Sequence, residues 1–229
     1  MTEFTEKPAA VFFDLDGTLL DTAEDFRYLL NELRQEQALP PLCLDQVRPW
    51  VSEGSRCMIS EGLAELQLDA SALEKQRKTF LDRYAQHPAR FSHLFPGMDH
   101  LLQQLQAAAI PWGIVTNKPS RYTSPLLAAL QLEPATTVCP DGLIHTKPHP
   151  EGLLKAAAAL GQDPSGCWYI GDHPRDIEAG LRAGMRTVAA AWGYIPATMH
   201  PQQWGAHYTV NEVANLWPLL FASGSSFYA

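Results

Sequence analysis

The chain has 229 residues, of which 46% are hydrophobic and 18% are charged, a balance typical of a soluble globular protein with a sizeable core. Lys and Arg number 17 against 25 Asp and Glu, and the formal net charge of −8 argues against a nucleic-acid partner. The negative net charge does not exclude a small anionic ligand, because a few side chains or a metal can create positive potential locally. With no membrane-length apolar stretch, no signal core and no paired cysteine spacing, we expect a cytoplasmic protein without a membrane partner.

Residues 9–22 join a short apolar run to a pair of carboxylates. Residues 9–13 are uniformly apolar, as expected of a buried central strand. Asp14 and Asp16 follow two positions apart, with Gly17 behind them, so an extended chain places both carboxylates on one face at the strand end. Two adjacent anions repel unless a cation or a proton offsets their charge. This stretch alone fits an Asp-rich turn and a divalent-metal and phosphate site equally well.

Residues 21–92 predict helices and no strand. Apolar residues at helical spacing predict a helix over 25–37, and shorter helices over 44–50 and 56–66 flank a polar break. A long charged helix is predicted over 71–86, with Ser71 as its N-cap. We expect Trp50 and Tyr84 to pack inside this helical region, which is the usual fate of such aromatic residues.

From residue 96 onward, helical segments alternate with short apolar ones. Helices are predicted over 97–109, 120–130, 150–160, 176–183 and 213–221, and strands over 112–115, 137–139, 167–170, 186–190 and 208–210. The alternation predicts an α/β fold, a Rossmann-like doubly wound parallel sheet whose sites lie at the carboxyl ends of its strands. We therefore predict a core domain of residues 1–20 and 93–229, with an inserted all-helical cap domain of residues 21–92. The Ser- and Gly-containing segment 223–226 is expected to be a flexible end.

Three further polar clusters follow predicted strands. Thr116 and Asn117 suit an oxyanion, although a helix cap and turn is the commoner role of such a pair. Lys147 precedes a helix, where an ammonium suits a phosphate, and a solvated loop lysine is the usual alternative. Asp172 and Asp176 form another carboxylate pair, in which Asp172 either completes a hard-cation site or begins a helix. Together, at the strand ends of one sheet, these clusters favour a metal and phosphate site.

These segments, in this order, resemble the haloacid-dehalogenase superfamily, whose pattern begins with DxDGT and ends with GDxxxD. The matching segments are residues 14–18, 116–117, 147–148 and 171–176. Within the superfamily, residues 19–22, 116–119 and 176–180 are similar to the phosphoglycolate-phosphatase group. Residues 94–98, 138–141 and 192–195 are similar to the branch that hydrolyses N-acetylmuramic acid 6-phosphate. The resemblance covers essentially the whole chain, helical cap included.

The resemblance implies a Mg²⁺-dependent phosphatase that forms an aspartyl-phosphate. Asp14 would be the nucleophile and a metal ligand, and Asp16 the general acid and base, also holding the metal through its backbone carbonyl. Asp172 would complete the metal site, and Asp176 would orient the metal ligands. The phosphate would be bound by side chains that donate hydrogen bonds or carry positive charge, namely Thr116, Asn117 and Lys147.

Asp16 also bears on the class of reaction. A dehalogenase displaces halide, which needs no proton, so a carboxylate at this position indicates an alkoxide leaving group. A phosphatase and a sugar phosphomutase remain open, and the group-specific segments favour the phosphatase. A non-catalytic phosphoryl-binding protein is the alternative from another class, opposed by the complete set of carboxylates and lysine. The leading substrates are N-acetylmuramic acid 6-phosphate, slightly favoured, and 2-phosphoglycolate.

Substrate choice is expected to lie in the cap, around the polar break 52–56. This break resembles the cap loop that faces the catalytic site in relatives, and Gly54 would let the backbone approach a substrate. Arg56 would bind a substrate carboxylate, which both candidate substrates carry; a surface arginine at a helix start is the equal alternative. His173, where relatives commonly carry Asp or Ser, is expected to be a surface residue at a helix start. No oligomeric state is indicated.

Overall fold

The computed structural model describes residues 7–221, so the segment 223–226 lies outside the described residues. Its main sheet has six strands in the order β5-β4-β1-β6-β7-β8, and every pair of neighbours is parallel. The strands are β1 (Ala10–Phe13), β4 (Trp112–Val115), β5 (Thr136–Val138), β6 (Cys167–Gly171), β7 (Arg186–Ala190) and β8 (Tyr208–Val210). This confirms the predicted α/β fold with a parallel sheet.

Each face of the sheet packs against its own hydrophobic cluster, because alternate residues of a strand point to opposite sides. Val11 and Phe13 of β1 belong to one cluster, whereas Ala10 and Phe12 belong to the other, and all four are fully buried. The first cluster includes residues of α5 (Met98–Ala107), α6 (Ser120–Ala129) and α9 (Leu216–Phe221). The second includes residues of α7 (Glu151–Ala159) and α8 (Pro174–Arg182). The sheet is therefore doubly wound.

The strand order brings the ends of three strands together. β1 lies between β4 and β6, and Phe13 is in register with Ile114 on one side and Ile170 on the other. The chain moves outward from β1 through β4 to β5 and then returns to β6, so the strand order reverses beside β1. Ligands bind at such a switch point, outside the carboxyl ends of the strands.

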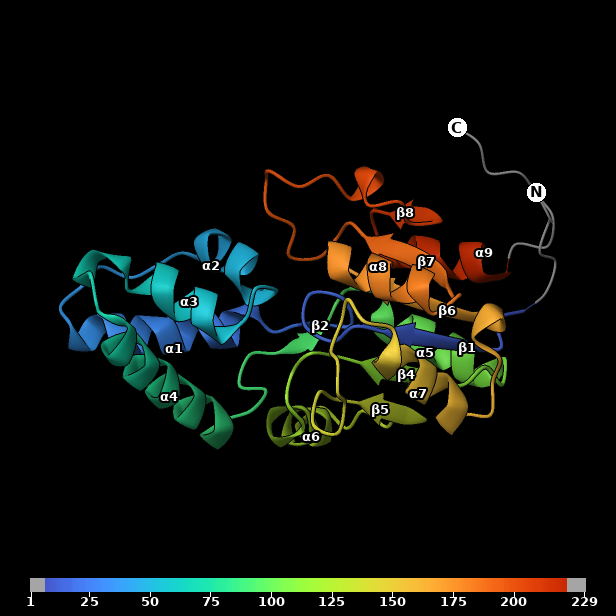
Figure 1. Cartoon of the computed structure of the whole chain (residues 1–229), viewed down its shortest axis with the longest axis horizontal. Coiled ribbons are helices and arrows are strands. Elements are labelled where there is room, and N and C mark those ends of the chain that lie inside the picture. The colour runs from blue at the N-terminus through green and yellow to red at the C-terminus, as the bar shows by residue number, and fades with distance from the viewer. Residues whose placement is uncertain (1–6, 222–229) are drawn as a thin grey trace.

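Four further helices lie to one side of the sheet, α1 (Ala23–Glu36), α2 (Leu44–Val51), α3 (Ser55–Gly62) and α4 (Ala70–Gln86) (Figure 1). They pack through apolar faces; the Phe26 ring of α1 lies 6.0 Å from the Phe80 ring and 4.9 Å from the Tyr84 ring of α4. Trp50 is partly buried against the same cluster. The division into a core and a cap of residues 21–92 stays a proposal. No helix between residues 7 and 221 is long and apolar enough to cross a membrane.

The two connections between the sheet and these helices pair with each other. β2 (Leu20–Asp21) and β3 (His93–Leu94) form a two-stranded antiparallel ribbon, visible between the two groups of elements in Figure 1. Sequence analysis missed this ribbon and predicted no strand over 21–92, because two residues are too few to show an alternating pattern.

Several helix ends differ from their predicted positions because capping decides them. The N-cap of α4 is Asp69 rather than Ser71, since the Asp69 carboxylate accepts a hydrogen bond from the Ala72 N–H at 2.8 Å. The helix predicted over 56–66 ends at Gly62 and is followed by a short 3₁₀ turn over Ala64–Leu66. α8 begins at Pro174, two residues earlier than predicted, with His173 as its N-cap.

Candidate active site

Asp14, the first residue after β1, lies against a buried ammonium. Lys147 Nζ is 2.8 Å from Asp14 Oδ1 and 2.7 Å from Asp176 Oδ1, and it donates to the Tyr169 hydroxyl at 2.8 Å. The Lys147 side chain is 3% exposed, so it is not a solvated loop lysine. Three segments, the end of β1, the β5–α7 loop and α8, therefore meet at one charged cluster.

Asp172, the first residue after β6, is held from both sides. Its Oδ1 accepts from the Thr18 hydroxyl and its Oδ2 from the Tyr194 N–H, both at 2.9 Å. Gly17 has a φ of +86°, and a Cβ at this position would lie 2.2 Å from Asp172 Oδ2. The turn after β1 therefore requires glycine, because any side chain would collide with the carboxylate.

Three carboxylates share this site. One carboxylate oxygen from each of Asp14, Asp172 and Asp176 lies within 4.8 Å of the others. Burial raises the pKa of Asp14 to about 6, against the lowering effect of Lys147, and raises the pKa of Asp172 to about 8, with Asp14 and Asp176 adding repulsion. One ammonium cannot balance three carboxylates. The donor set therefore fits a hard divalent cation with oxygen ligands, such as Mg²⁺.

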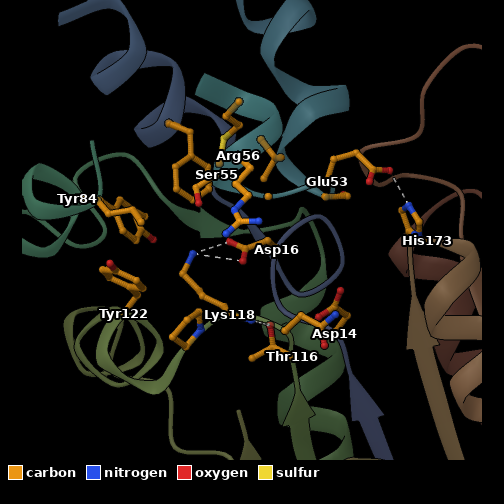
Figure 2. A pocket seen from close by; sticks show the side chains of 18 of the residues that line it. Asp14, Asp16, Glu53, Ser55, Arg56, Tyr84, Thr116, Lys118, Tyr122 and His173 are labelled. Atoms are coloured by element: carbon orange, nitrogen blue, oxygen red, sulfur yellow. Dashed lines mark hydrogen bonds and ion pairs between the residues drawn. The ribbon is translucent and has the colours of Figure 1, made fainter. Parts of the chain in front are cut away.

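Asp16 is paired with a lysine that sequence analysis did not select. Lys118 Nζ lies 2.9 and 3.2 Å from the two oxygens of Asp16 (Figure 2). Thr22 donates its hydroxyl to Asp16 Oδ1 at 2.6 Å. The ammonium lies over two aromatic rings of the α1–α4 group, Phe26 at 4.8 Å and Tyr84 at 4.7 Å from the ring centroids. Burial disfavours its charge, but Asp16 more than offsets this and raises the pKa of Lys118. Two signals were available, its position directly after Thr116-Asn117 and its place in the segment 116–119, which is similar to the phosphoglycolate-phosphatase group.

Thr116 and Asn117 follow β4 as predicted. Thr116 is 3% exposed and faces the cavity, while its hydroxyl accepts from the Lys118 N–H at 3.1 Å (Figure 2). Asn117 donates to the Lys147 carbonyl and accepts from the Lys147 N–H, both at 3.2 Å. The Asn117 amide thus holds the backbone of the loop that presents the Lys147 ammonium to Asp14.

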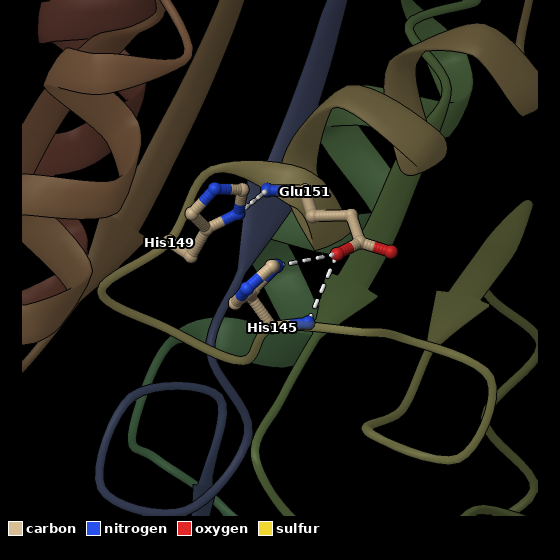
Figure 3. A group of neighbouring side chains, drawn as sticks. All are labelled: His145, His149 and Glu151. Carbon is tan, nitrogen blue, oxygen red and sulfur yellow. Dashed lines mark hydrogen bonds and ion pairs between the residues drawn. The ribbon is translucent and has the colours of Figure 1, made fainter.

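A second group of potential metal ligands joins this loop to the start of α7, namely His145, His149 and Glu151 (Figure 3). Glu151 accepts from two backbone N–H groups of the loop at 2.9 and 3.1 Å and pairs with Lys155 at 2.9 Å. His149 Nδ1 in turn accepts from the Glu151 N–H at 3.2 Å. These contacts already use the carboxylate, so the group is best described as an anchor of the loop that carries Lys147.

A cavity of about 400 Å³ opens between these strand ends and the α1–α4 group. Arg56 points from α3 into it (Figure 2) and forms no ion pair within the described part of the chain. Gly54, the N-cap of α3, has a φ of +89° and nothing within 4 Å of a Cβ, so glycine is needed there for its backbone conformation rather than for space. Both predicted cap residues therefore line the cavity.

The loop before α3 also touches the strand-end residues. Ser52 donates to Asp172 Oδ2 at 3.3 Å, while Glu53 lies 2.9 Å from His173 Nε2 and 3.0 Å from Arg175 Nη2. His173 is at a helix start, as expected, but its side chain is only 13% exposed and contacts the opposite wall of the cavity. The expectation of a surface residue was wrong because Glu53, which is 120 positions away in sequence, covers it.

Comparison with known proteins agrees with this geometry. Residues 11–190 match the family model "Haloacid dehalogenase-like hydrolase". The chain is 43% identical over 209 residues to N-acetylmuramic acid 6-phosphate phosphatase of Pseudomonas aeruginosa, covering 90% of this chain and 92% of that protein. It is equally 43% identical over 212 residues to a phosphoglycolate phosphatase of Xanthomonas campestris pv. campestris, covering 92% and 95%.

The fold has similar crystal structures. A predicted phosphoglycolate phosphatase from Haemophilus somnus superimposes with a TM-score of 0.81 at 22% identity, covering 95% of this chain and 99% of that one. The match extends over the helices as well as the sheet. With the family model, two relatives above 40% identity and this fold in agreement, the chain belongs to the haloacid dehalogenase-like hydrolases and is a phosphatase.

Proposed function

We propose that this phosphatase is a Mg²⁺-dependent phosphomonoesterase that hydrolyses N-acetylmuramic acid 6-phosphate or 2-phosphoglycolate through an aspartyl-phosphate. The observation that carries the proposal is the contact between Asp14 and the buried Lys147 ammonium, beside two further buried carboxylates. The negative charge of Asp14 alone would repel an anionic phosphate. The Lys147 ammonium and a bound cation offset this charge, so that the phosphate can approach the Asp14 carboxylate.

In the first step the Asp14 carboxylate attacks phosphorus and the bond from phosphorus to the substrate oxygen breaks. Asp16 donates its proton to the departing alkoxide, which leaves as an alcohol. In the second step Asp16 takes a proton from water, and this water attacks the phosphorus of the aspartyl-phosphate, releasing inorganic phosphate and restoring Asp14.

The remaining residues have supporting roles. Thr116 and Lys147 stabilise the phosphoryl oxygens, and Asn117 positions Lys147 through its backbone. Asp14, Asp172 and the backbone carbonyl of Asp16 would hold Mg²⁺, which supplies positive charge to offset that of the phosphate. Asp176 contacts the same ammonium as Asp14 and orients it.

The two candidate substrates are those for which the two bacterial relatives are named. Each carries a carboxylate in addition to its phosphate, and Arg56, which lines the cavity, is the side chain that would bind it. The four cysteines are free thiols, which fits an enzyme of the cytoplasm.

Steady-state turnover of purified protein with Mg²⁺ tests the proposal. The panel contains N-acetylmuramic acid 6-phosphate, 2-phosphoglycolate, hexose phosphates and nucleotides, compared by kcat/KM for phosphate release. We expect one of the first two esters to exceed the rest. Conversion of a sugar phosphate to an isomer without phosphate release would instead indicate a mutase. Phosphate binding without turnover of any ester would indicate a phosphoryl-binding protein.

A further inference from the structure

Glu53, in the loop between α2 and α3, spans one side of the cavity. Its Oε1 lies 2.9 Å from His173 Nε2, and its Oε2 accepts a hydrogen bond from Arg175 Nη2 at 3.0 Å (Figure 2). His173 is the N-cap of α8 and Arg175 lies in its first turn, so both contacts join the helical group to the strand-end side. These two contacts are called the Glu53 bridge below.

The bonds around His173 define which groups donate in the bridge. His173 Nδ1 accepts from the Arg175 N–H at 3.2 Å and from Arg175 Nε at 3.0 Å. The proton of the neutral ring is therefore on Nε2, which donates to Glu53. Burial disfavours the Glu53 carboxylate, but the His173 hydrogen bond and the Arg175 charge outweigh this and lower the pKa of Glu53. The bridge thus forms with a neutral histidine, and Arg175 supplies its positive charge.

The neighbours of Glu53 hold the loop less firmly. Ser52 donates to Asp172 Oδ2 at 3.3 Å, which is longer than either contact of the bridge. Gly54 has nothing within 4 Å of the position of a Cβ. A hydrogen bond between charged groups is stronger than one from a hydroxyl at longer range. The Glu53 bridge therefore supplies the firmest contact between this loop and the strand-end side.

Arg56 follows the bridge closely in the chain. Gly54 is the N-cap of α3 and Ser55 its first residue, so Arg56 lies in the first turn, three positions after Glu53. A fixed position of Glu53 therefore fixes the start of α3, from which Arg56 points into the cavity (Figure 2). A side chain that is oriented before the substrate arrives loses less conformational freedom on binding.

Resting on the phosphatase function proposed above, we propose that the Glu53 bridge holds residues 52–56 against the strand-end side, so that Arg56 faces the leaving group of the substrate. Glu53 is a positioning residue, which acts through Arg56 and takes no part in the transfer of the phosphoryl group. The bridge also neutralises Glu53, whose charge would otherwise repel an anionic substrate at the cavity wall.

Glu53→Ala removes both contacts at a side chain that is 39% exposed, where folding tolerates the change. We expect KM for N-acetylmuramic acid 6-phosphate and 2-phosphoglycolate to rise about threefold to fivefold, because Arg56 is no longer held toward their carboxylates. KM for phenyl phosphate, and kcat for all three esters, should stay within about twofold of wild type. The melting temperature should stay within about 2 °C, since a partly exposed ion pair contributes little to stability.

A second comparison tests whether Glu53 acts through Arg56. If it does, adding Glu53→Ala to an Arg56→Ala protein should change KM for the carboxylate esters less than about twofold, because the side chain that Glu53 positions is already absent. A purely structural role of Glu53 would give the same loss in both backgrounds.

Hydrogen exchange tests the bridge without any substrate. The backbone N–H groups of residues 52–58 should exchange at least about threefold faster in Glu53→Ala and in Arg175→Ala than in wild type. The double variant should exchange no faster than the faster single variant, since both replacements break the same contact. Glu61→Ala is the matched control, at an exposed glutamate of α3 outside the cavity lining and without an ion pair in the described part of the chain, and should match wild type throughout.

Three results would overturn the inference. Unchanged exchange in both single variants would mean that the bridge does not hold the loop in solution. An equal rise in KM with phenyl phosphate, or the same loss with and without Arg56, would mean that Glu53 does not act through Arg56. Wild-type protein without activity on any phosphomonoester would instead overturn the proposed function, and the exchange comparison would still test the bridge.

Discussion

The two walls of the cavity differ in how completely their polar groups are paired. On the strand-end side, Asp14, Asp172 and Lys147 each have at least two partners at 2.7–2.9 Å, and Lys147 is almost fully buried. On the helical side, Arg56 lines the cavity and forms no ion pair within the described region.

The difference separates the two tasks of a phosphatase. A phosphoryl group is the same in every substrate, so the groups that handle it gain from being fixed before it binds. The leaving group varies, so the groups that recognise it complete their hydrogen bonds only when it arrives. Substitutions on the strand-end side should therefore lower activity with every ester, whereas substitutions on the helical side should have smaller effects that depend on the ester.

Asp14→Asn should have the largest effect. It removes the proposed nucleophile while keeping the shape of the side chain, so kcat should fall at least about 1,000-fold with every ester. Acid quenching during turnover should trap a phosphorylated protein in the wild type and none in the variant.

Asp45→Asn, at an exposed site on α2, is the control and should behave as wild type. Retention of more than about a tenth of the activity by Asp14→Asn would remove the nucleophile role from Asp14.

Lys118→Met should come next, with a loss of about 100-fold in kcat for all esters, because Asp16 loses the ammonium that orients it. Lys78→Met removes a lysine that is 78% exposed and should leave kcat unchanged. A Lys118→Met loss confined to sugar phosphates would place Lys118 with the leaving-group residues and break the division between the two walls.

The pH dependence of Mg²⁺ binding should be smaller than the effect of Lys118→Met and larger than that of Arg56→Ala. Burial raises the pKa of Asp172 from its ordinary value to about 8, so without metal the folded state keeps a proton that the unfolded state releases. The metal-free protein should therefore lose stability as the pH rises from about 4 to about 8, and Mg²⁺ affinity should increase about tenfold per pH unit up to about pH 8.

Thermal melts with chelator and with Mg²⁺ measure how stability changes with pH. Calorimetric titrations with Mg²⁺ at several pH values measure how the affinity changes with pH. Asp172→Asn should lose most of the Mg²⁺ stabilisation and its pH dependence. An affinity for Mg²⁺ that is constant from about pH 6 to about pH 9 would mean that the metal does not displace this proton.

Arg56→Ala should have the smallest effect and the most selective one. KM should rise about tenfold for esters that carry a carboxylate and hardly change for phenyl phosphate, because only the former lose an ion pair. Arg90→Ala, at a residue that lies over the Tyr28 ring and is not part of the cavity lining, should change neither value. A uniform change in kcat with Arg56→Ala would instead place Arg56 among the phosphoryl-handling residues.

Much of the strand-end wall was predictable from local sequence. A buried strand is apolar throughout, so an abrupt change to Asp14 or Asp172 marks its end, and parallel pairing brings such ends to one edge. The contacts Lys118–Asp16 and Glu53–His173 were not predictable, since they join residues 102 and 120 positions apart. Helix caps shifted by one or two residues where several polar residues competed, as Asp69 did with Ser71.

The sequence by itself therefore determined the parallel sheet and most of the residues at its strand ends, because both follow from hydrophobic periodicity along the chain. The tertiary structure alone decided how the helical group faces these ends, which brought Lys118 to Asp16 and to the rings of Phe26 and Tyr84. Periodicity predicts which face of a helix is buried. It does not predict what lies opposite that face, which depends on packing between segments far apart in the chain.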